Sequence, residues 1–319
     1  MRTTYEGGVP LAEVVRSGFV EGLHHGSVAV LDAAGAPVAG AGDVTSPIFP
    51  RSASKPMQAI GMLRAGLALS DPADVALVSA SHAGEDFHVA RVGALLAAAG
   101  LDESALDCPP DLPLGELARE AVLRAGDGPT RARMNCSGKH TGMVLTCLAA
   151  GWSREGYWRP EHPLQQRLRA AVEEFTGERV AAVGVDGCGA PVLAVSLTGL
   201  ARAFLRLVTG EPGSAERTVA DAMRAYPEVV GGTWAEDSRL MRGLPGTLAK
   251  IGAEGVIAAA LPGVGAVAVK IDDGATRARM PVLVSALRRL GARAPVLDEY
   301  AELPLLGGGL PVGAVRPLW

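Results

Sequence analysis

A serine and a lysine three residues apart are the first side chains in this sequence that could do chemistry together. Ser52 and Lys55 occur in the text Arg-Ser-Ala-Ser-Lys-Pro-Met-Gln, ahead of a run with helical periodicity that ends near Gly66. Positions i and i+3 share one face of a helix, so the amine can approach the hydroxyl. A neutral lysine could take the serine proton and make the serine a nucleophile. The alternative is a serine that caps a helix and a lysine that faces solvent.

A second serine and a second lysine follow further along the chain. Ser81 lies with His82 and Glu85 in a turn before a helix, where Ser81 and Glu85 could also be a simple capping pair. Lys270 lies near the end of an apolar strand, where an ammonium is costly unless it points into a polar cleft. There it could relay a proton or hold a substrate carboxylate, or it could only be a solubilising lysine on an edge strand.

Lysine is scarce in this chain, which makes each lysine informative. Of the thirty basic residues only Lys55, Lys139, Lys250 and Lys270 are lysine. Arginine does not lose its proton inside a protein, whereas a buried lysine can become neutral and act as a base or a ligand. We therefore expect some of these lysines to be functional.

Two glycine-containing turns each hold a cysteine. Cys136 occurs in Asn-Cys-Ser-Gly-Lys-His and Cys188 in Asp-Gly-Cys-Gly-Ala-Pro. The fold could bring the two thiols together, with Lys139 or His140 as a third donor, in the three-ligand pattern of a zinc site with one open position. The alternative is that the cysteines are small buried apolar residues.

The elements that must position these residues follow from hydrophobic periodicity. Residues 13–43 alternate β-prone runs and turns, which predicts an antiparallel meander. Residues 52–224 are largely helical, with glycine stops after 87–99, 114–125 and 163–175, and a strand at 179–186. Further predicted elements are a hairpin of strands 255–260 and 266–271, a helix at 275–290, and a tail rich in Pro and Gly.

Strands near both ends of the chain must share one sheet, because isolated hairpins bury too little apolar surface to be stable. The predicted fold class is therefore α/β (α+β), with a mainly antiparallel sheet and a helical lobe. We expect one catalytic domain of two interlocked lobes: a sheet lobe from about 1–50 and 250–319, and a helical lobe from about 51–249. The cleft between the lobes is the expected place for chemistry.

Composition narrows the classes of function. The 319 residues are 48% hydrophobic and 20% charged, with a net charge of -4 and no basic run, so neither nucleic acid nor a membrane surface is an expected partner. No signal peptide or membrane span is evident, and four irregularly spaced cysteines suggest no disulfide framework. Cys108 and Cys147 are interpreted as packing residues. We expect a cytoplasmic protein that binds a small molecule.

Taken in order, these segments resemble the L-asparaginase family typified by rhizobial thermolabile enzymes. The resemblance spans about Val9 to Met280, and its most specific parts are the two cysteine-containing motifs. It implies a fold similar to serine β-lactamases and glutaminases, an amidohydrolase that converts L-asparagine to L-aspartate and ammonia, and a homodimer.

The resemblance also implies roles for individual residues. Two Ser-Lys pairs, Ser52 with Lys55 and Ser81 with Lys270, would face one pocket, Lys250 being the alternative to Lys270. Ser52 would form the acyl-enzyme. Zinc would be bound by Cys136, Lys139 and Cys188, with Asp186 on the metal-bound water. The positions implied to contact substrate are Arg51, His82, Glu85, Asn135, His140 and Asp186.

Two other functions remain open at this point. A Ser-x-x-Lys arrangement acylates many carbonyl compounds, so a glutaminase or a hydrolase that reacts with β-lactams is the first alternative. A non-catalytic zinc or thiol sensor on the same scaffold is the second, but it would not explain why the rare lysines accompany serines.

Overall fold

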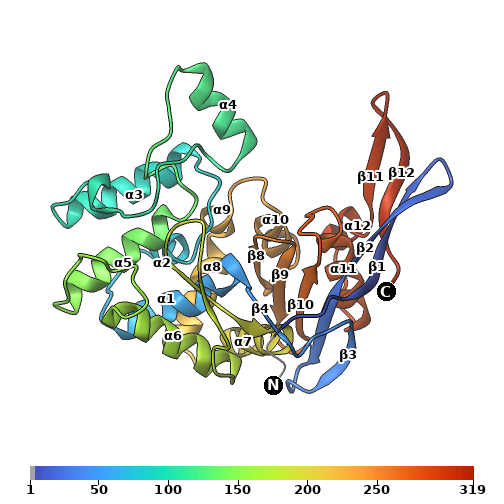
Figure 1. Cartoon of the computed structure of the whole chain (residues 1–319), viewed down its shortest axis with the longest axis horizontal. Coiled ribbons are helices and arrows are strands. Elements are labelled where there is room, and N and C mark those ends of the chain that lie inside the picture. Colours follow the sequence, from blue (N-terminus) through green and yellow to red (C-terminus); the bar gives the residue numbers. More distant parts are fainter. Residues whose placement is uncertain (1–3) are drawn as a thin grey trace.

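The structure, a computed structural model that describes residues 4–319, is built around one large antiparallel sheet (Figure 1). The strand order is β11-β12-β1-β2-β10-β9-β8, and β3 pairs with β2 beside this path. The strands are β1 (Val9–Arg16), β2 (Phe19–Asp32), β3 (Pro37–Ala41), β8 (Leu248–Gly252), β9 (Val256–Leu261), β10 (Gly265–Ile271), β11 (Leu303–Gly307) and β12 (Leu310–Pro317). Because β1 pairs with β12, the two ends of the chain meet in this sheet, as predicted.

The middle of the sheet is buried on both faces. Nearly every residue of β9 and β10 is buried, and most are Ala, Val or Ile. Successive strand residues point to opposite faces, so both faces must be covered. Helix α7 (Leu197–Thr209) packs on β2, β9 and β10, and α11 (Arg279–Arg289) packs on β10, β12 and β1. The small side chains let these helices approach the sheet closely.

The helices between β4 and β8 form the rest of the molecule. They are α1 (Lys55–Arg64), α2 (Pro72–Val78), α3 (Asp86–Ala98), α4 (Glu116–Arg124), α5 (Ser137–Ala149), α6 (Pro163–Thr176), α8 (Ala215–Ala225), α9 (Pro227–Val230) and α10 (Glu236–Gly243), with the short elements η1 (Arg51–Ser54), β4 (Pro47–Ile48), η2 (Glu103–Ala105), β5 (Val183–Val185), β6 (Pro191–Leu193), β7 (Val195–Ser196) and, after β10, α12 (Pro295–Glu299). Helix α1 is central, because it contacts α2, α5, α6 and α8. Among residues 4–319, no helix has both the length and the apolar character needed to cross a bilayer.

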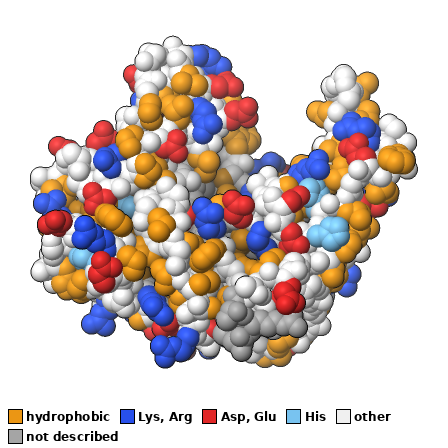
Figure 2. Space-filling view, in the orientation of Figure 1, with side chains coloured by type: hydrophobic (Ala, Val, Ile, Leu, Met, Phe, Trp, Pro, Cys, Tyr) orange, Lys and Arg blue, Asp and Glu red, His pale blue; other side chains and the backbone are white. Residues whose placement is uncertain are grey.

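Two parts of the molecule project from this packed centre: helix α4 and a pair of hairpins. Helix α4 contains no buried residue and stands above the other helices in Figure 1, and the β1–β2 and β11–β12 hairpins project from the opposite end of the sheet. The surface is hollowed between these two projections, as Figure 2 shows. The site described below lies where α4 meets the body of the protein.

The predicted fold class is confirmed: the protein is a mixed α/β structure with a mainly antiparallel sheet from its N- and C-terminal segments and a helical part between them. The N-terminal meander, the helices α3, α4 and α6, and the β9–β10 hairpin lie close to their expected positions. The predicted tail is wrong, because it contains the β11–β12 hairpin. Its turn residues Gly308 and Gly309 both have positive φ, and such a turn resembles an irregular tail in sequence.

The packing of α5 on α2 is tight at Gly138. A Cβ atom there would lie 2.5 Å from the carbonyl oxygen of Leu77 and 2.8 Å from its Cγ. We expect Gly138→Ala to lower the free energy of unfolding by about 1–3 kcal/mol, because α5 must move away from α2. Urea denaturation followed by circular dichroism would measure the change.

Gly93, inside the exposed part of α3, is the matched control. A Cβ atom there would have no neighbour within 4 Å. Gly93→Ala should raise the free energy of unfolding by roughly 0.5–1 kcal/mol, since it removes only the entropic cost of a helical glycine. Equal stability of Gly138→Ala and the wild type would contradict the close contact between the two helices.

Candidate active site

The segment that carries Ser52 is a strained turn leading into the central helix. Arg51 has φ of 52°, in the left-handed region that residues with a side chain rarely adopt, and η1 passes directly into α1 at Lys55. On its outer side η1 packs against β8, where a Cβ atom at Gly252 would lie 2.3 Å from the carbonyl oxygen of Pro50. Glycine at that position lets the edge of the sheet approach the start of α1.

The two serines of this segment have different surroundings. Ser54 is buried, and its hydroxyl donates to the carbonyl oxygen of Arg51 at 2.8 Å and accepts from Nε2 of Gln58 at 3.0 Å. Ser52 is partly exposed. Ser54 therefore has a structural role, and of the two serines only Ser52 is accessible to a ligand.

The Lys55 side chain is buried and points toward Ser81. Its Nζ lies 2.6 Å from Oγ of Ser81, 2.6 Å from the carbonyl oxygen of Ala80 and 3.1 Å from Sγ of Cys136. The sequence paired Lys55 with Ser52, but the hydrogen-bond partner of its amine is Ser81. The structure thus combines one member of each predicted pair.

Lys250 brings a second buried amine to this region. It lies on β8, is fully buried, and donates to Oδ2 of Asp237 at 3.3 Å and to the carbonyl oxygen of Ile251 at 3.1 Å. Burial, opposed by the nearby Asp237 carboxylate and assisted by the charge of the neighbouring Lys55, lowers the pKa of Lys250 to about 8. Lys250 therefore loses its proton far more easily than an exposed lysine.

Lys270 does not reach Ser81. Its Nζ donates to the carbonyl oxygens of Glu254 at 2.7 Å and Ile271 at 2.6 Å, and the side chain is only partly buried. The predicted pairing of Ser81 with Lys270 is therefore not formed. The reason is topological: β10 lies behind β9 and β8, whereas β8 is the edge strand that packs on η1. Neighbouring strands are about 4.8 Å apart, too far for the β10 lysine to cross two of them.

Arg51 and Asp186 form an ion pair beside the start of α1. Nε of Arg51 donates to Oδ1 of Asp186 at 2.8 Å, and the same oxygen accepts from the backbone amide of Gly187 at 2.9 Å. A weaker contact of 3.8 Å joins Arg51 to Glu254. These contacts tie the turn that contains Cys188 to the turn that contains Ser52.

The other residues implied to contact substrate lie at different depths. His82 is completely buried, stacks on His88 with ring centroids 4.7 Å apart, and its Nε2 lies 2.8 Å from Oγ of Ser137. Burial lowers the pKa of His82 well below its ordinary value. His140 is also buried, with Nδ1 2.7 Å from the hydroxyl of Tyr157. These two histidines are part of the packed interior.

Asn135 and Glu85 are partly exposed, unlike the two histidines, and Glu85 lines the cavity. The backbone carbonyl of Asn135 accepts from the amide of His82 at 3.0 Å, and its Oδ1 accepts from Sγ of Cys136 at 3.2 Å. The carboxylate of Glu85 accepts from the backbone amide and the hydroxyl of Thr233, both at 2.7 Å. Glu85 thereby holds the loop before α10 against the segment of Ser81.

The two motif cysteines lie together beneath Lys55. Sγ of Cys188 accepts from Nζ of Lys139 at 3.1 Å, while Cys136 contacts Lys55. A hydrogen bond from Cys136 and the charge of Lys139 lower the pKa of the Cys188 thiol despite its burial. Burial alone would lower the pKa of Lys139, but the Cys188 thiolate raises it. These two shifts favour a thiolate on Cys188 and an ammonium on Lys139.

No group of three or more His, Cys, Asp and Glu within residues 4–319 could hold a metal ion. The predicted donor set contains only two residues of those types, because its third member is Lys139. Cys108 and Cys147 are free and buried, in keeping with packing residues.

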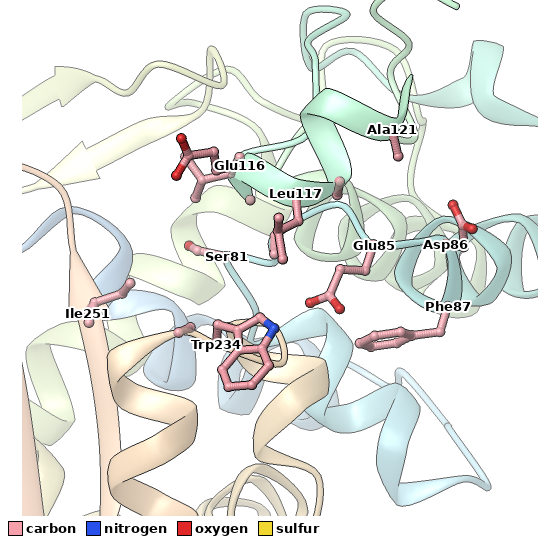
Figure 3. Close-up of a pocket in the computed structure, with 15 residues that line it drawn as sticks. Ser81, Glu85, Asp86, Phe87, Glu116, Leu117, Ala121, Trp234 and Ile251 are labelled. Atoms are coloured by element: carbon pink, nitrogen blue, oxygen red, sulfur yellow. The ribbon is translucent and has the colours of Figure 1, made fainter. Parts of the chain in front are cut away.

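A cavity of about 790 Å³ lies beside Ser81 (Figure 3). Ser81 and Ile251, the residue after Lys250, lie at one end of it, and Glu85 and Phe87 lie toward the other. Leu117 of α4 and Trp234 face each other across the space between. The cavity therefore joins the lysine cluster to a larger, mostly apolar volume.

Sequence reasoning missed Trp234, Leu117 and Asp237. Trp234 follows the text Gly-Gly-Thr, which reads only as a turn, and Leu117 reads as an ordinary helical leucine. Asp237 gave no signal either, because its burial and its contact with Lys250 are visible only in the structure.

The chain is similar to several solved structures at low identity. One is Mglu in its native form, with 18% identity and a TM-score of 0.44 over 82% of this chain and 62% of that one. Another is a β-lactamase from Mycobacterium bovis, with 17% identity and a TM-score of 0.43 over 78% of this chain and 88% of that one. A third is EstCE1, a hydrolase with promiscuous acyltransferase activity, with 15% identity and a TM-score of 0.40 over 90% of this chain and 93% of that one. The chain thus spans 62% of the length of Mglu.

A comparison with curated proteins gave no match. The family model of L-asparaginase II, in contrast, matches residues 12–317, nearly the whole chain. The matched region contains every residue of the site described above. The chain belongs to the L-asparaginase II family.

Proposed function

We propose that this protein hydrolyses L-asparagine to L-aspartate and ammonia through an acyl-enzyme on a serine. The observation that carries the proposal is the buried Lys55 amine 2.6 Å from the Ser81 hydroxyl, at the end of a cavity and near a second buried lysine, Lys250. Amines held out of water beside a hydroxyl are suited to moving protons in acyl transfer. The family to which the chain belongs supplies the substrate class.

Ser52 is the proposed nucleophile. It is the partly exposed serine of the strained turn, one helical turn before Lys55, and it lies at the start of α1. Its hydroxyl would attack the side-chain carbonyl carbon, and backbone amides at the helix start would stabilise the oxyanion. Lys55 would accept the serine proton, and Ser81 would pass a proton to the departing nitrogen. Water would then release aspartate.

Lys250 replaces Lys270 as the second lysine of the proposal. A buried lysine with a pKa of about 8 can be neutral when the enzyme works, and its neutral amine could then take part in proton transfer beside Lys55. Asp237 holds its amine in place. Lys250 would thus act as a second base in the proton relay.

The thiol cluster is the proposed zinc site. Two buried thiols, one with a lowered pKa, and an amine are donors that zinc accepts, and the buried His140 ring interacts with the Cys188 thiol. We propose that Cys136, Lys139 and Cys188 hold the metal. Zinc there would order the pocket or orient substrate. It could bind Lys139 only as the neutral amine, so its binding must displace the lysine proton.

The predicted homodimer and the predicted cytoplasmic location remain predictions. Light scattering coupled to size-exclusion chromatography would give the number of chains in the particle. The substrate comparison below separates asparaginase from glutaminase and from a β-lactam hydrolase.

Removing the proposed nucleophile should abolish turnover. We expect Ser52→Ala to reduce ammonia release from asparagine by at least about 10³-fold, because water replaces a bound nucleophile. Ser54→Ala is the matched control, and it should retain turnover because the Ser54 hydroxyl is used within η1 and α1. Ammonia release from asparagine and glutamine, and hydrolysis of a chromogenic β-lactam, would be measured on each variant. Full activity of Ser52→Ala would favour a sensor or a different nucleophile.

Substitution and pH dependence distinguish the roles of the two strand lysines, Lys250 and Lys270. Lys250→Met should lower kcat/KM by about 10²-fold or more, whereas Lys270→Met should leave it within about threefold, because the Lys270 amine donates to backbone carbonyls of Glu254, between β8 and β9, and of Ile271 in its own strand. Since the neutral form of Lys250 is required, wild-type kcat/KM should rise with pH through about 8. A profile of kcat/KM from pH 5 to 10 would show this limb. Its persistence in Lys250→Met would rule Lys250 out.

Metal content tests the zinc proposal independently of activity. Elemental analysis of the purified protein should find about one zinc per chain, because three donors converge. Cys188→Ser should lose the metal, since a hydroxyl is a weak zinc ligand. Cys147→Ser, a buried cysteine on the same helix as Lys139 and outside the cluster, should keep it. Metal-free wild-type protein with full activity would contradict the proposal.

A further inference from the structure

The cavity beside Ser81 offers more room than the side-chain amide of asparagine needs. Its volume of about 790 Å³ lies within the range of roughly 300–1,000 Å³ found for pockets that enclose drug-sized ligands. Asparagine ends in a primary amide, and only the Ser81 end of the cavity would contact that group. Most of the volume is left without a role in the hydrolysis of free asparagine.

The unused part of the cavity is walled by apolar side chains that are open to solvent. Trp234 is 71% exposed, and Leu117 is 66% exposed on α4, a helix with no buried residue. In Figure 3 the two face one another, and Phe87 points toward the same space. An exposed indole and an exposed leucine on opposite sides of one cavity are unfavourable in water unless a ligand covers them.

The charges around the cavity are of one sign. Glu85, Asp86 and Glu116 line it, and neither Lys nor Arg is among the described residues of its wall. In Figure 3 the Glu85 carboxylate reaches toward the space between Trp234 and Phe87. An acidic, apolar volume favours a neutral or cationic apolar group and disfavours an anionic one.

We infer that the substrates of this enzyme include secondary amides, in which the side-chain amide nitrogen of an asparagine carries an arylalkyl group that occupies the space between Leu117 and Trp234. The inference rests on the proposed function, in which Ser81 delivers a proton to the departing nitrogen. Because Ser81 lies at the end of the cavity, that nitrogen would be released into it.

The reaction balances without any further reagent. The Ser52 hydroxyl oxygen bonds to the amide carbon, the bond from carbon to nitrogen breaks, and the nitrogen takes the proton that Ser81 passes on, so that the amine leaves. Water then cleaves the acyl-enzyme to aspartate and regenerates the serine. The products are aspartate and a primary arylalkylamine in place of ammonia. The apolar walls would contribute binding energy that free asparagine cannot use.

The first experiment compares three substrates with wild-type enzyme: L-asparagine, the β-(2-phenylethyl)amide of L-aspartate, and Nα-phenylacetyl-L-asparagine. The inference requires hydrolysis of the phenylethylamide with kcat/KM at least equal to that of asparagine. A phenylethylamide with a carboxylate on the ring should be at least about tenfold poorer than the neutral one, because the cavity wall is acidic.

Two leucines of α4 provide matched variants. Leu117 lines the cavity, whereas Leu123, 55% exposed on the same helix, does not. Leu117→Ala should lower the ratio of kcat/KM for phenylethylamide over asparagine by about tenfold, the usual effect of removing part of an apolar pocket, while Leu123→Ala should leave this ratio unchanged. Both leucines are at the surface, so neither variant should affect folding.

The outcomes separate the two proposals. Hydrolysis of asparagine without the phenylethylamide overturns the inference and leaves the proposed function standing. Hydrolysis of Nα-phenylacetyl-asparagine but not of the phenylethylamide also overturns it, because the apolar group would then lie on the amino-acid side. If Leu117→Ala and Leu123→Ala have the same ratio of kcat/KM for phenylethylamide over asparagine, the arylalkyl group does not bind beside Leu117, and the inference is overturned. Failure to hydrolyse either amide overturns the proposed function and the inference together.

Discussion

Three lysine amines held out of water are the constraint on which the rest of this structure depends. Lys55, Lys139 and Lys250 are all buried, and an uncompensated buried charge costs several kcal/mol. Each amine therefore needs polar partners at hydrogen-bonding distance: Ser81 and a carbonyl for Lys55, Cys188 for Lys139, and Asp237 for Lys250. These partners come from segments far apart in the sequence, so the cluster exists only when the fold is complete.

The fold satisfies this constraint by bringing an edge strand to the start of a central helix. Helix α1 is surrounded by other helices, and its first residue is Lys55. Gly252 removes the side chain that would separate β8 from η1, which brings Lys250 near Lys55. The strained conformation of Arg51 at the same junction is supported by its ion pair with Asp186. Strain of this kind persists only where the surroundings hold it in place.

Lys55 also connects two parts of the site that would otherwise be separate. On one side its amine contacts Ser81, which lines the cavity, and on the other it contacts Cys136 of the thiol cluster. The protonation of the thiols therefore acts on the same amine that is positioned to serve the serine. Electrostatic coupling at such short range is strong in a buried site. The cavity and the thiol cluster are best regarded as two ends of one site.

The sequence by itself determined the local features of this protein. Periodicity and glycine stops predicted α3, α4 and α6, strands at both ends of the chain predicted a shared sheet, and the motifs around Lys55, Cys136 and Cys188 indicated where the polar interior lies. These signals are local because they depend on the residues within a few turns of helix or strand.

Only the tertiary structure decided which of these residues meet. The sequence could not show that Lys55 contacts Ser81, or that Lys250 is near this cluster and Lys270 is not, because both lysines follow apolar strand residues and differ only in the order of strands in the sheet. It also could not show that Trp234 and Leu117 face one cavity, because a single sequence does not reveal which surface residues of distant segments are neighbours in space. Pairing across a sheet and between helices is set by the packing of the whole chain.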